Sequence, residues 1–146
     1  MSRQYYLDSS VLVKKYITES GTPYITNLFS GNFLFYTSCI AYPEVYSVFN
    51  RLGRTGFLSS DKKSNLLEDF EKDWASIIVI DYGEDVHEAI PGIAERFFLS
   101  GGDSIHLACA AVLKSQGLDP AFLTSDLRLL NAASEYGFDA VNPAEK

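Results

Sequence analysis

The sequence predicts a three-layer α/β fold, in which a mostly parallel central sheet of about five strands is flanked by helices. Three observations lead to this fold class. Short runs rich in β-branched and aromatic residues alternate with longer segments of helical periodicity. Glycines follow several of the helical segments, as they do at helix C-termini. The 146 residues contain no internal repeat or low-complexity segment, so we expect a single domain over residues 1–146.

Five segments are predicted to form strands because each is short, apolar and bounded by turn-forming residues. In chain order they are Gln4–Leu7, Phe33–Tyr36, Ile77–Ile80, Phe122–Thr124 and Ala140–Val141. The third is a continuous run of β-branched residues, which is typical of a strand buried on both faces. The carboxyl ends of parallel strands lie at one edge of a sheet, and ligands of such folds bind there. Polar residues at these ends are therefore the first candidates for a functional site.

Seven segments between and after the strands are predicted to be helices. In chain order they are Ser10–Tyr16, Pro23–Phe29, Ser38–Leu52, Ser60–Trp74, Glu84–Leu99, Ser104–Ser115 and Leu127–Tyr136. Within the third, Ala41, Val45 and Phe49 repeat at helical spacing and form an apolar stripe. Gly53 and Gly137 directly follow predicted helices and are expected to end them.

Composition places the chain among ordinary globular proteins, with 47% hydrophobic and 21% charged residues. No apolar run approaches the ~18 residues of a membrane span, and no secretory signal is visible, so we expect a cytoplasmic protein without a membrane partner. Cys39 and Cys109 lie in apolar, helix-like segments and are expected to be buried, reduced thiols. The formal net charge of −7 argues against bulk electrostatic binding of nucleic acid, although acids gathered around a cation would distort that count.

Three aspartates stand where strands end or helices begin. Asp8 follows the first strand and Asp126 follows the fourth, and a helix comes after each. Asp103 follows Gly101 and Gly102, which we expect to break the preceding helix. Each aspartate is suited to capping a helix or to the first helical turn, where the helix dipole favours negative charge. Taken singly, all three are explained better as structural residues than as ligands.

Glu44 is harder to explain as a structural residue. It lies at the edge of the apolar stripe, where a carboxylate is costly unless it is paired or bound to a metal. Arg51 on the same helix could supply an ion pair. Pro43 must either begin this helix or kink it. A functional role for Glu44 is at least as well supported as a structural one.

Taken together, the four acids indicate a metal site. Converging carboxylates repel one another, and their pKa values rise unless a cation lies between them. Mg²⁺ binds few carboxylates, keeps several waters and leaves room for substrate phosphates. Such a site can activate water and stabilise the charge on a phosphodiester during displacement. The sequence offers no cluster of cysteines or histidines that would favour a different metal.

The segments that carry these acids resemble the PIN domain, and the overall form is closest to the toxin ribonucleases of VapBC-type toxin–antitoxin pairs. The segments are YLDSSVL, PEVYSVFNRL, GGDSIHLACAAVL and FLTSDLRLLNAASEYGF, and the likeness extends over nearly the whole chain. The resemblance implies a PIN-like fold and an endoribonuclease that depends on Mg²⁺ or Mn²⁺. It also implies an RNA substrate, a small antitoxin protein as a partner, and a homodimer.

The resemblance also assigns residues. The catalytic and metal-binding positions of the family fall on Asp8, Glu44, Asp103 and Asp126. Ser10 and Thr124 match the polar positions that support the first and last of these acids. The strongly acidic balance and Pro43 depart from the family pattern.

A histidine, two phenylalanines and three arginines are further candidates for the site. His106 follows Asp103 by three residues, and we expect it to pack in the core with a satisfied ring nitrogen, outside the site. Phe97 and Phe98 are expected to be core or dimer contacts and not base-stacking residues. A solvated helix face explains Arg51 and Arg54 slightly better than contact with RNA phosphates does, and Arg128 could steer phosphate toward the acids.

Two other classes of function remain open on the residues alone. The first is a phosphotransfer α/β domain, either a receiver or a HAD-like phosphatase, with Asp81 as a candidate acceptor in the receiver case. Ser10 stands where a HAD-like enzyme needs its second aspartate, and the acidic pair of a receiver is absent near Asp8. The second is a non-catalytic PIN-like binding module whose acids serve as caps and ion pairs. It predicts no stabilisation by divalent metals.

Overall fold

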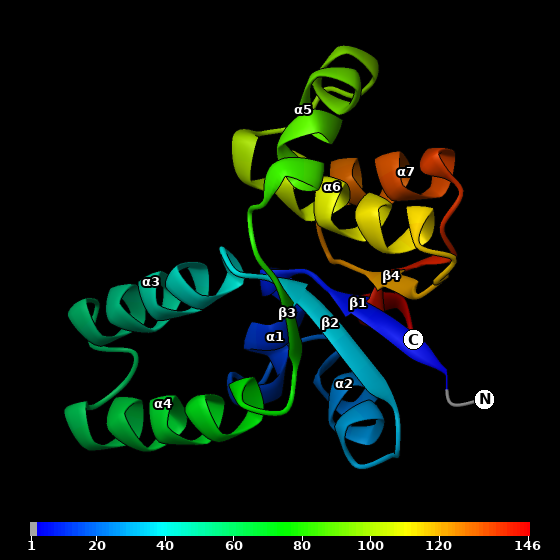
Figure 1. The fold of residues 1–146 in the computed structure, drawn as a ribbon. Coiled ribbons are helices and arrows are strands. Elements are labelled where there is room, and N and C mark those ends of the chain that lie inside the picture. The colour runs from blue at the N-terminus through cyan, green and yellow to red at the C-terminus, as the bar shows by residue number, and fades with distance from the viewer. Residues whose placement is uncertain (1–2) are drawn as a thin grey trace.

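A five-stranded parallel sheet forms the centre of the molecule in the computed structural model, which describes residues 3–146 (Figure 1). The strands are β1 (Gln4–Leu7), β2 (Leu34–Ser38), β3 (Ile78–Ile80), β4 (Ala121–Leu123) and β5 (Ala140–Val141). Their order across the sheet is β3-β2-β1-β4-β5, and every neighbouring pair is parallel. Because β1 is the central strand, the residue that follows it lies at the middle of the carboxyl edge.

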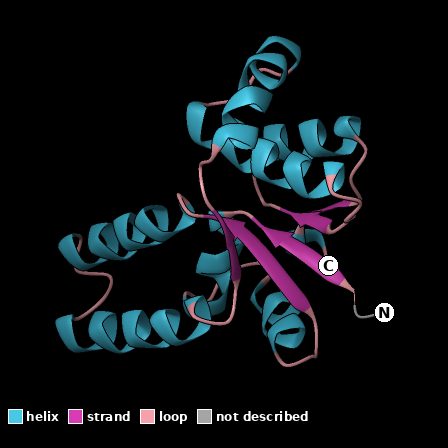
Figure 2. Ribbon diagram, viewed as in Figure 1, coloured by secondary structure: helices cyan, strands magenta, loops and turns pink. Residues whose placement is uncertain are grey.

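Helices cover both faces of this sheet, as Figure 2 shows. The helices are α1 (Ser9–Tyr16), α2 (Thr22–Phe29), α3 (Ala41–Arg54), α4 (Ser60–Trp74), α5 (Glu84–Arg96), α6 (Gly101–Ser115), α7 (Leu127–Tyr136) and the short 3₁₀ helix η1 (Pro143–Glu145). Helices α5, α6 and α7 lie on one face, and α1 and α2 lie on the other. Helices α3 and α4 form a hairpin that projects to the side of the sheet (Figure 1).

Two hydrophobic cores follow from this arrangement. Tyr5 and Leu7 of β1 pack in the core under α1 to α4, whereas Tyr6 packs in the core under α5, α6 and α7. Side chains of a strand alternate between faces, so one central strand serves both cores. This sandwich confirms the predicted three-layer α/β fold. Of the helices in residues 3–146, none combines the length and apolar character that a membrane crossing requires.

The predicted burial of the third strand is wrong, because this strand lies at the edge of the sheet. The run at residues 77–80 was expected to be buried on both faces, but β3 pairs only with β2 and Ile78 is 42% exposed. A β-branched run reports local strand preference and not the number of neighbouring strands. Ser38 also belongs to β2, through its pairing with Ile80, so α3 begins three residues later than expected.

Glycines account for further differences in helix limits. Gly101 and Gly102 do not break a helix: they open α6, which Ser100 caps by accepting a hydrogen bond from the backbone of Asp103. Gly53 lies inside α3. The turn after α3 instead contains Gly56, whose φ of 81° suits glycine.

Two side chains lie in other surroundings than expected. Cys39 is half-buried in the turn after β2, whereas Cys109 is buried in α6 as predicted. Phe97 packs in the core, but Phe98 is 87% exposed and is not a core residue.

Candidate active site

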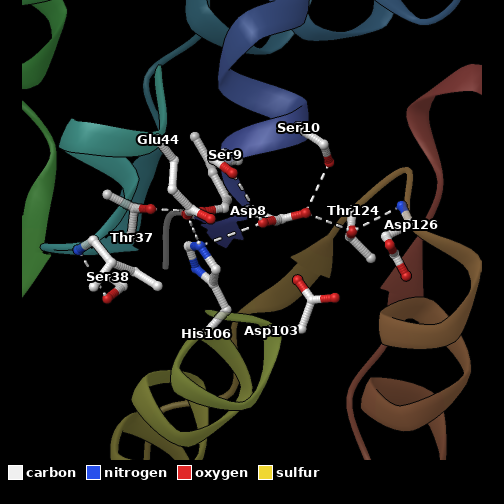
Figure 3. A network of polar contacts seen from close by, with 12 residues as sticks. Asp8, Ser9, Ser10, Thr37, Ser38, Glu44, Asp103, His106, Thr124 and Asp126 are labelled. Carbon is white, nitrogen blue, oxygen red and sulfur yellow. Dashed lines mark hydrogen bonds and ion pairs between the residues drawn. The ribbon is translucent and has the colours of Figure 1, made fainter. Parts of the chain in front are cut away.

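Asp8 lies at the carboxyl end of β1 and is only 4% exposed. It occupies the N-cap position of α1, yet its side chain makes no capping hydrogen bond. Instead, Oδ2 accepts hydrogen bonds from Ser10 Oγ and Thr124 Oγ1, both at 2.8 Å, and Oδ1 lies 3.4 Å from Ser9 Oγ (Figure 3). A buried carboxylate needs such donors, because burial without them costs several kcal/mol (about 2–7 for a polar group). The capping explanation therefore does not account for Asp8.

Glu44 lies in the first turn of α3, which begins at Ala41. Pro43 is also in this turn, where a missing N–H breaks no helical hydrogen bond. The backbone N–H of Glu44 donates to the carbonyl of Ile40 at 3.2 Å, so the helix continues without a kink. Pro43 therefore fits within the first turn without kinking the helix, and the Glu44 side chain lies at the carboxyl edge of the sheet.

His106 of α6 is the partner of Glu44, and Arg51 is not. The imidazole Nε2 lies 2.8 Å from Glu44 Oε1 and 3.4 Å from Asp8 Oδ1, and Nδ1 lies 2.9 Å from the Tyr6 hydroxyl. Burial lowers the pKa of His106, but its hydrogen bond to Glu44 and the nearby carboxylate charges outweigh burial and raise it overall. The ring thus joins β1, α3 and α6 at the site.

Sequence reasoning excluded His106 from the site, and the structure brings it in. The ring is fully buried and both nitrogens have partners, as expected for a core histidine. Those partners, however, include Glu44 and Tyr6, which are 62 and 100 residues away in sequence. The available signal was its spacing of three from Asp103, which places both side chains on one face of a helix.

Asp103 lies in the first turn of α6 and is half-buried. Burial and the charges of Asp8 and Asp126 raise the pKa of Asp103 to about 6, although His106 and Ser100 act in the opposite direction. This shift places the three aspartates in one electrostatic group.

Asp126 is a true helix cap, in contrast to Asp8. Its Oδ1 accepts a hydrogen bond from the backbone N–H of Leu129 at 3.0 Å at the start of α7. Its own N–H donates to Thr124 Oγ1 at 3.1 Å, so one threonine hydroxyl contacts both aspartates. Asp126 is exposed, and capping uses a single carboxylate oxygen. The cap is therefore compatible with a second role.

The four acids and the histidine suit a divalent cation. Atoms of Asp8, Glu44 and His106 that could act as ligands all lie within 4.8 Å of one another, and Asp103 and Asp126 lie outside this group. Figure 3 shows Asp103 and Asp126 beside Asp8 on the opposite side from Glu44. Within residues 3–146, no lysine or arginine forms an ion pair with any of the four acids. Oxygen-rich, negatively charged sites of this kind fit Mg²⁺ or Mn²⁺.

A cleft opens beside these acids between α1 and α3. Its volume is about 470 Å³, and it is lined by Ser9, Ser10, Val13, Pro43, Glu44, Ser47 and Val48. Because Glu44 is part of its wall, a molecule in the cleft reaches the acids directly.

Asp81 lies apart from this group. It follows the edge strand β3, with β2 between that strand and β1. The acceptor of a receiver domain was expected to end a central strand. The structure therefore gives no support to the receiver form of the phosphotransfer alternative.

Comparisons with known proteins agree with this geometry. Residues 5–135 match the model of the PIN domain family. Over 113 residues the chain is 29% identical to ribonuclease VapC45 of Mycobacterium tuberculosis strain CDC 1551 / Oshkosh and to ribonuclease VapC49 of strain ATCC 25618 / H37Rv. Each alignment covers 77% of this chain and 78% of the relative.

Solved structures share the fold. VapBC2 from Rickettsia felis, bound to a DNA fragment from its promoter, has a TM-score of 0.66 at 12% identity, covering 95% of this chain and 98% of that chain. PAE2754 from Pyrobaculum aerophilum has a TM-score of 0.68 at 17% identity, and the match covers 98% of this chain and 85% of that chain. A toxin–antitoxin complex from Klebsiella pneumoniae has a TM-score of 0.60 at 16% identity, and the match covers 84% of this chain and 86% of that chain.

Proposed function

The chain belongs to the PIN domain family, and from this premise we propose that it is a metal-dependent endoribonuclease that acts in the cytoplasm as the toxin of a toxin–antitoxin pair. Two relatives that share 29% of aligned residues are named ribonucleases, and the alignments cover more than three quarters of each chain. The observation that carries the proposal is Asp8, a buried carboxylate held by hydroxyl groups, with Glu44 on one side and Asp103 and Asp126 on the other (Figure 3).

Asp8, Glu44, Asp103 and Asp126 would hold Mg²⁺ or Mn²⁺. When bound, such a cation lowers the pKa of water and stabilises negative charge on a phosphodiester. Burial, together with the charges of Asp8 and Asp126, raises the pKa of Asp103, and the charge contribution supports this assignment.

The neighbours of these acids fix their positions. Ser10 and Thr124 hold Asp8 Oδ2, and His106 holds Glu44 Oε1. Hydrogen-bonded supporting residues of this kind orient metal ligands, and their loss costs about 10–100-fold in metal affinity or activity. We assign His106 as a positioning residue, supported in turn by the Tyr6 hydroxyl.

RNA would lie across the carboxyl edge of the sheet. The nucleotides on one side of the cleaved bond would lie in the cleft between α1 and α3. The cleft contains no lysine or arginine, so its contacts to RNA would be hydroxyl and apolar ones. Neutralisation of phosphate there falls to the bound cation.

A small antitoxin protein and a second copy of the chain are the proposed protein partners. The Klebsiella pneumoniae structure with the same fold is a toxin–antitoxin complex, and the Rickettsia felis VapBC2 structure contains promoter DNA. We infer that this toxin is likewise held by an antitoxin and forms a homodimer. Co-expression with candidate small proteins and light scattering of the purified chain would test both inferences.

Cleavage of a mixed RNA pool by the purified protein in Mn²⁺ or Mg²⁺ tests the central proposal. We expect cutting that disappears with EDTA and in Asp8→Asn, by more than about 100-fold because a direct ligand matters more than its supports. Asp85→Asn, which alters an exposed acid on α5, is the matched control and should cleave as the parent does. Equal cleavage by Asp8→Asn and the parent contradicts the proposal.

Thermal melting of the same samples distinguishes the nuclease from a binding module. A ligand that binds the native state raises its melting temperature. Mn²⁺ should therefore stabilise the parent and have little effect on Asp8→Asn. If Mn²⁺ stabilises neither protein, the result would favour acids that serve only as caps and ion pairs.

A further inference from the structure

The loop between α5 and α6 and the start of α7 form an exposed patch beside the acids. Phe98 is 87% exposed and Leu127 is 62% exposed. The guanidinium of Arg128 lies over the Phe98 ring, 5.4 Å from its centroid. A phenylalanine presented to solvent in this way, with a cation beside it, marks a surface that another molecule covers.

A hollow of about 320 Å³ lies at this patch. It is lined by Arg96, Phe97, Phe98, Leu99, Arg128, Asn131, Ala132 and Glu135. The lining combines an aromatic face, two guanidinium groups, one side-chain amide and the carboxylate of Glu135. An aromatic face stacks on a base, guanidinium groups contact phosphate, and an amide can read a base edge.

The patch adjoins the Asp103 and Asp126 side of the site. Phe98 lies two residues before Ser100, the cap of the helix whose first turn carries Asp103. Arg128 lies two residues after Asp126 on α7. A strand of RNA that leaves these two acids therefore meets Phe98 and Arg128 next.

We propose that Phe98 and Arg128 bind one unpaired nucleotide of the RNA substrate next to the cleaved bond, with the base stacked on Phe98 and a phosphate on Arg128. This assignment rests on the proposed ribonuclease function and deepens it, because it places a single-strand binding position on the surface. It also reverses the expectation that Phe98 is a core or dimer contact.

Charge favours RNA over a second copy of the chain as the occupant. A twofold interface brings a patch against itself, so the two arginines of each copy would meet two further arginines and only one carboxylate, that of Glu135. RNA instead brings phosphates to these cations. The net charge of the protein is −7, whereas the hollow carries two arginines and one glutamate and is therefore locally positive.

Steady-state cleavage with Mn²⁺ tests the stacking contact. Relative to the parent, Phe98→Ala should raise the RNA concentration for half-maximal rate about 10-fold and leave the maximal rate within about 2-fold. Phe98→Tyr, which keeps an aromatic face, should restore the parent value. Phe57→Ala is the matched control, because Phe57 is 67% exposed in the turn between α3 and α4. Equal behaviour of the Phe98 and Phe57 alanine variants overturns the proposal while leaving the ribonuclease function intact.

Salt dependence tests the phosphate contact. The slope of log affinity against log salt falls by about 0.7 for each phosphate contact that a single strand loses. Arg128→Gln should reduce the slope by about this amount, and Arg128→Lys should keep it. An unchanged slope for Arg128→Gln removes Arg128 from the RNA contact.

Two further measurements separate failure of this inference from failure of the proposed function. Quenching of 2-aminopurine in a short single-stranded RNA reports stacking without cleavage. If no RNA is cut, quenching by the parent and not by Phe98→Ala still supports the patch, and absence of quenching overturns it. Light scattering reports the oligomeric state: conversion of a dimer to a monomer by Phe98→Ala would assign the patch to a second copy instead.

Discussion

Asp8 and Glu44 differ from Asp103 and Asp126 in what stabilises their charges. We call Asp8, Glu44 and His106 the paired half, because Asp8 accepts hydroxyl hydrogen bonds and Glu44 accepts one from the imidazole. We call Asp103 and Asp126 the open half. There, Asp126 is exposed, and Asp103 has a pKa raised by burial and by the charges of two other aspartates. The geometry of the paired half is thus set by protein groups, whereas the open half has an excess of negative charge that a cation would relieve.

The largest expected effect comes from breaking the paired half at its centre. His106→Asn removes the ring that contacts Glu44, Asp8 and Tyr6 in a fully buried position. We expect the free energy of unfolding in EDTA to fall by about 2–3 kcal/mol, because buried polar partners lose their hydrogen bonds. Urea denaturation measures this loss, and Mn²⁺ affinity should fall about 10–100-fold. A variant with parent-like Mn²⁺ affinity would show that His106 has only a packing role.

A smaller loss of stability is expected at Tyr6, which contacts the site through His106. Tyr6→Phe keeps the buried ring and removes the hydroxyl that meets His106 Nδ1. We expect a loss of about 1–2 kcal/mol in stability, together with a shift in the pH dependence of cleavage, because the orientation of the imidazole is no longer fixed. The exposed contact between Tyr82 and His87 provides a matched control. Tyr82→Phe removes the hydroxyl of this tyrosine–histidine pair and should change neither the stability nor the pH dependence of cleavage.

A change of opposite sign is expected in the open half. Because the folded-state pKa of Asp103 is raised to about 6, its ionised form destabilises the native state above that pH. Asp103→Asn should therefore raise stability in EDTA near pH 8 by about 1 kcal/mol, after allowance for solvent screening of a half-buried group. The gain should disappear as the pH falls from about 6 toward about 4. Denaturation at several pH values measures it, and lower stability of the variant near pH 8 would refute the picture of excess charge.

The smallest effect on stability is expected at Asp126. Asparagine is about as good an N-cap as aspartate, so Asp126→Asn should change the free energy of unfolding by no more than a few tenths of a kcal/mol. Calorimetric titration with Mn²⁺ should nevertheless show weaker binding. Unchanged Mn²⁺ affinity would mean that Asp126 is a cap and nothing more.

The sequence predicted site residues that local patterns mark, and it did not predict the one whose contacts are distant in sequence. Asp8, Asp103 and Asp126 were predicted because strand ends and helix starts are local features that a sequence displays, and Glu44 because it lies at the edge of an apolar stripe. His106 was missed because its partners lie 62 and 100 residues away, and no local pattern reports that distance. Family resemblance alone suggested that Ser10 supports Asp8 and that Thr124 supports Asp126, whereas the Thr124 hydroxyl donates to Asp8 and accepts from the Asp126 backbone.

The fold shows a similar contrast. The limits of β1, β5, α4 and α7 match the prediction, because caps, glycines and polar turns mark their ends. The burial of β3 was wrong because strand order across a sheet is a tertiary property. The exposure of Phe98 was missed for a related reason: an aromatic residue is expected inside unless the fold shows otherwise.

The central position of β1 has a consequence for the order in which the protein is made. Asp8 emerges first, but its donor Thr124 and its neighbouring strand β4 are more than a hundred residues later in the chain. The four acids span positions 8 to 126 of 146. A nascent chain therefore cannot bring the four acids together until Thr124 and Asp126 have been synthesised, because Asp8 and its donor Thr124 are 116 residues apart.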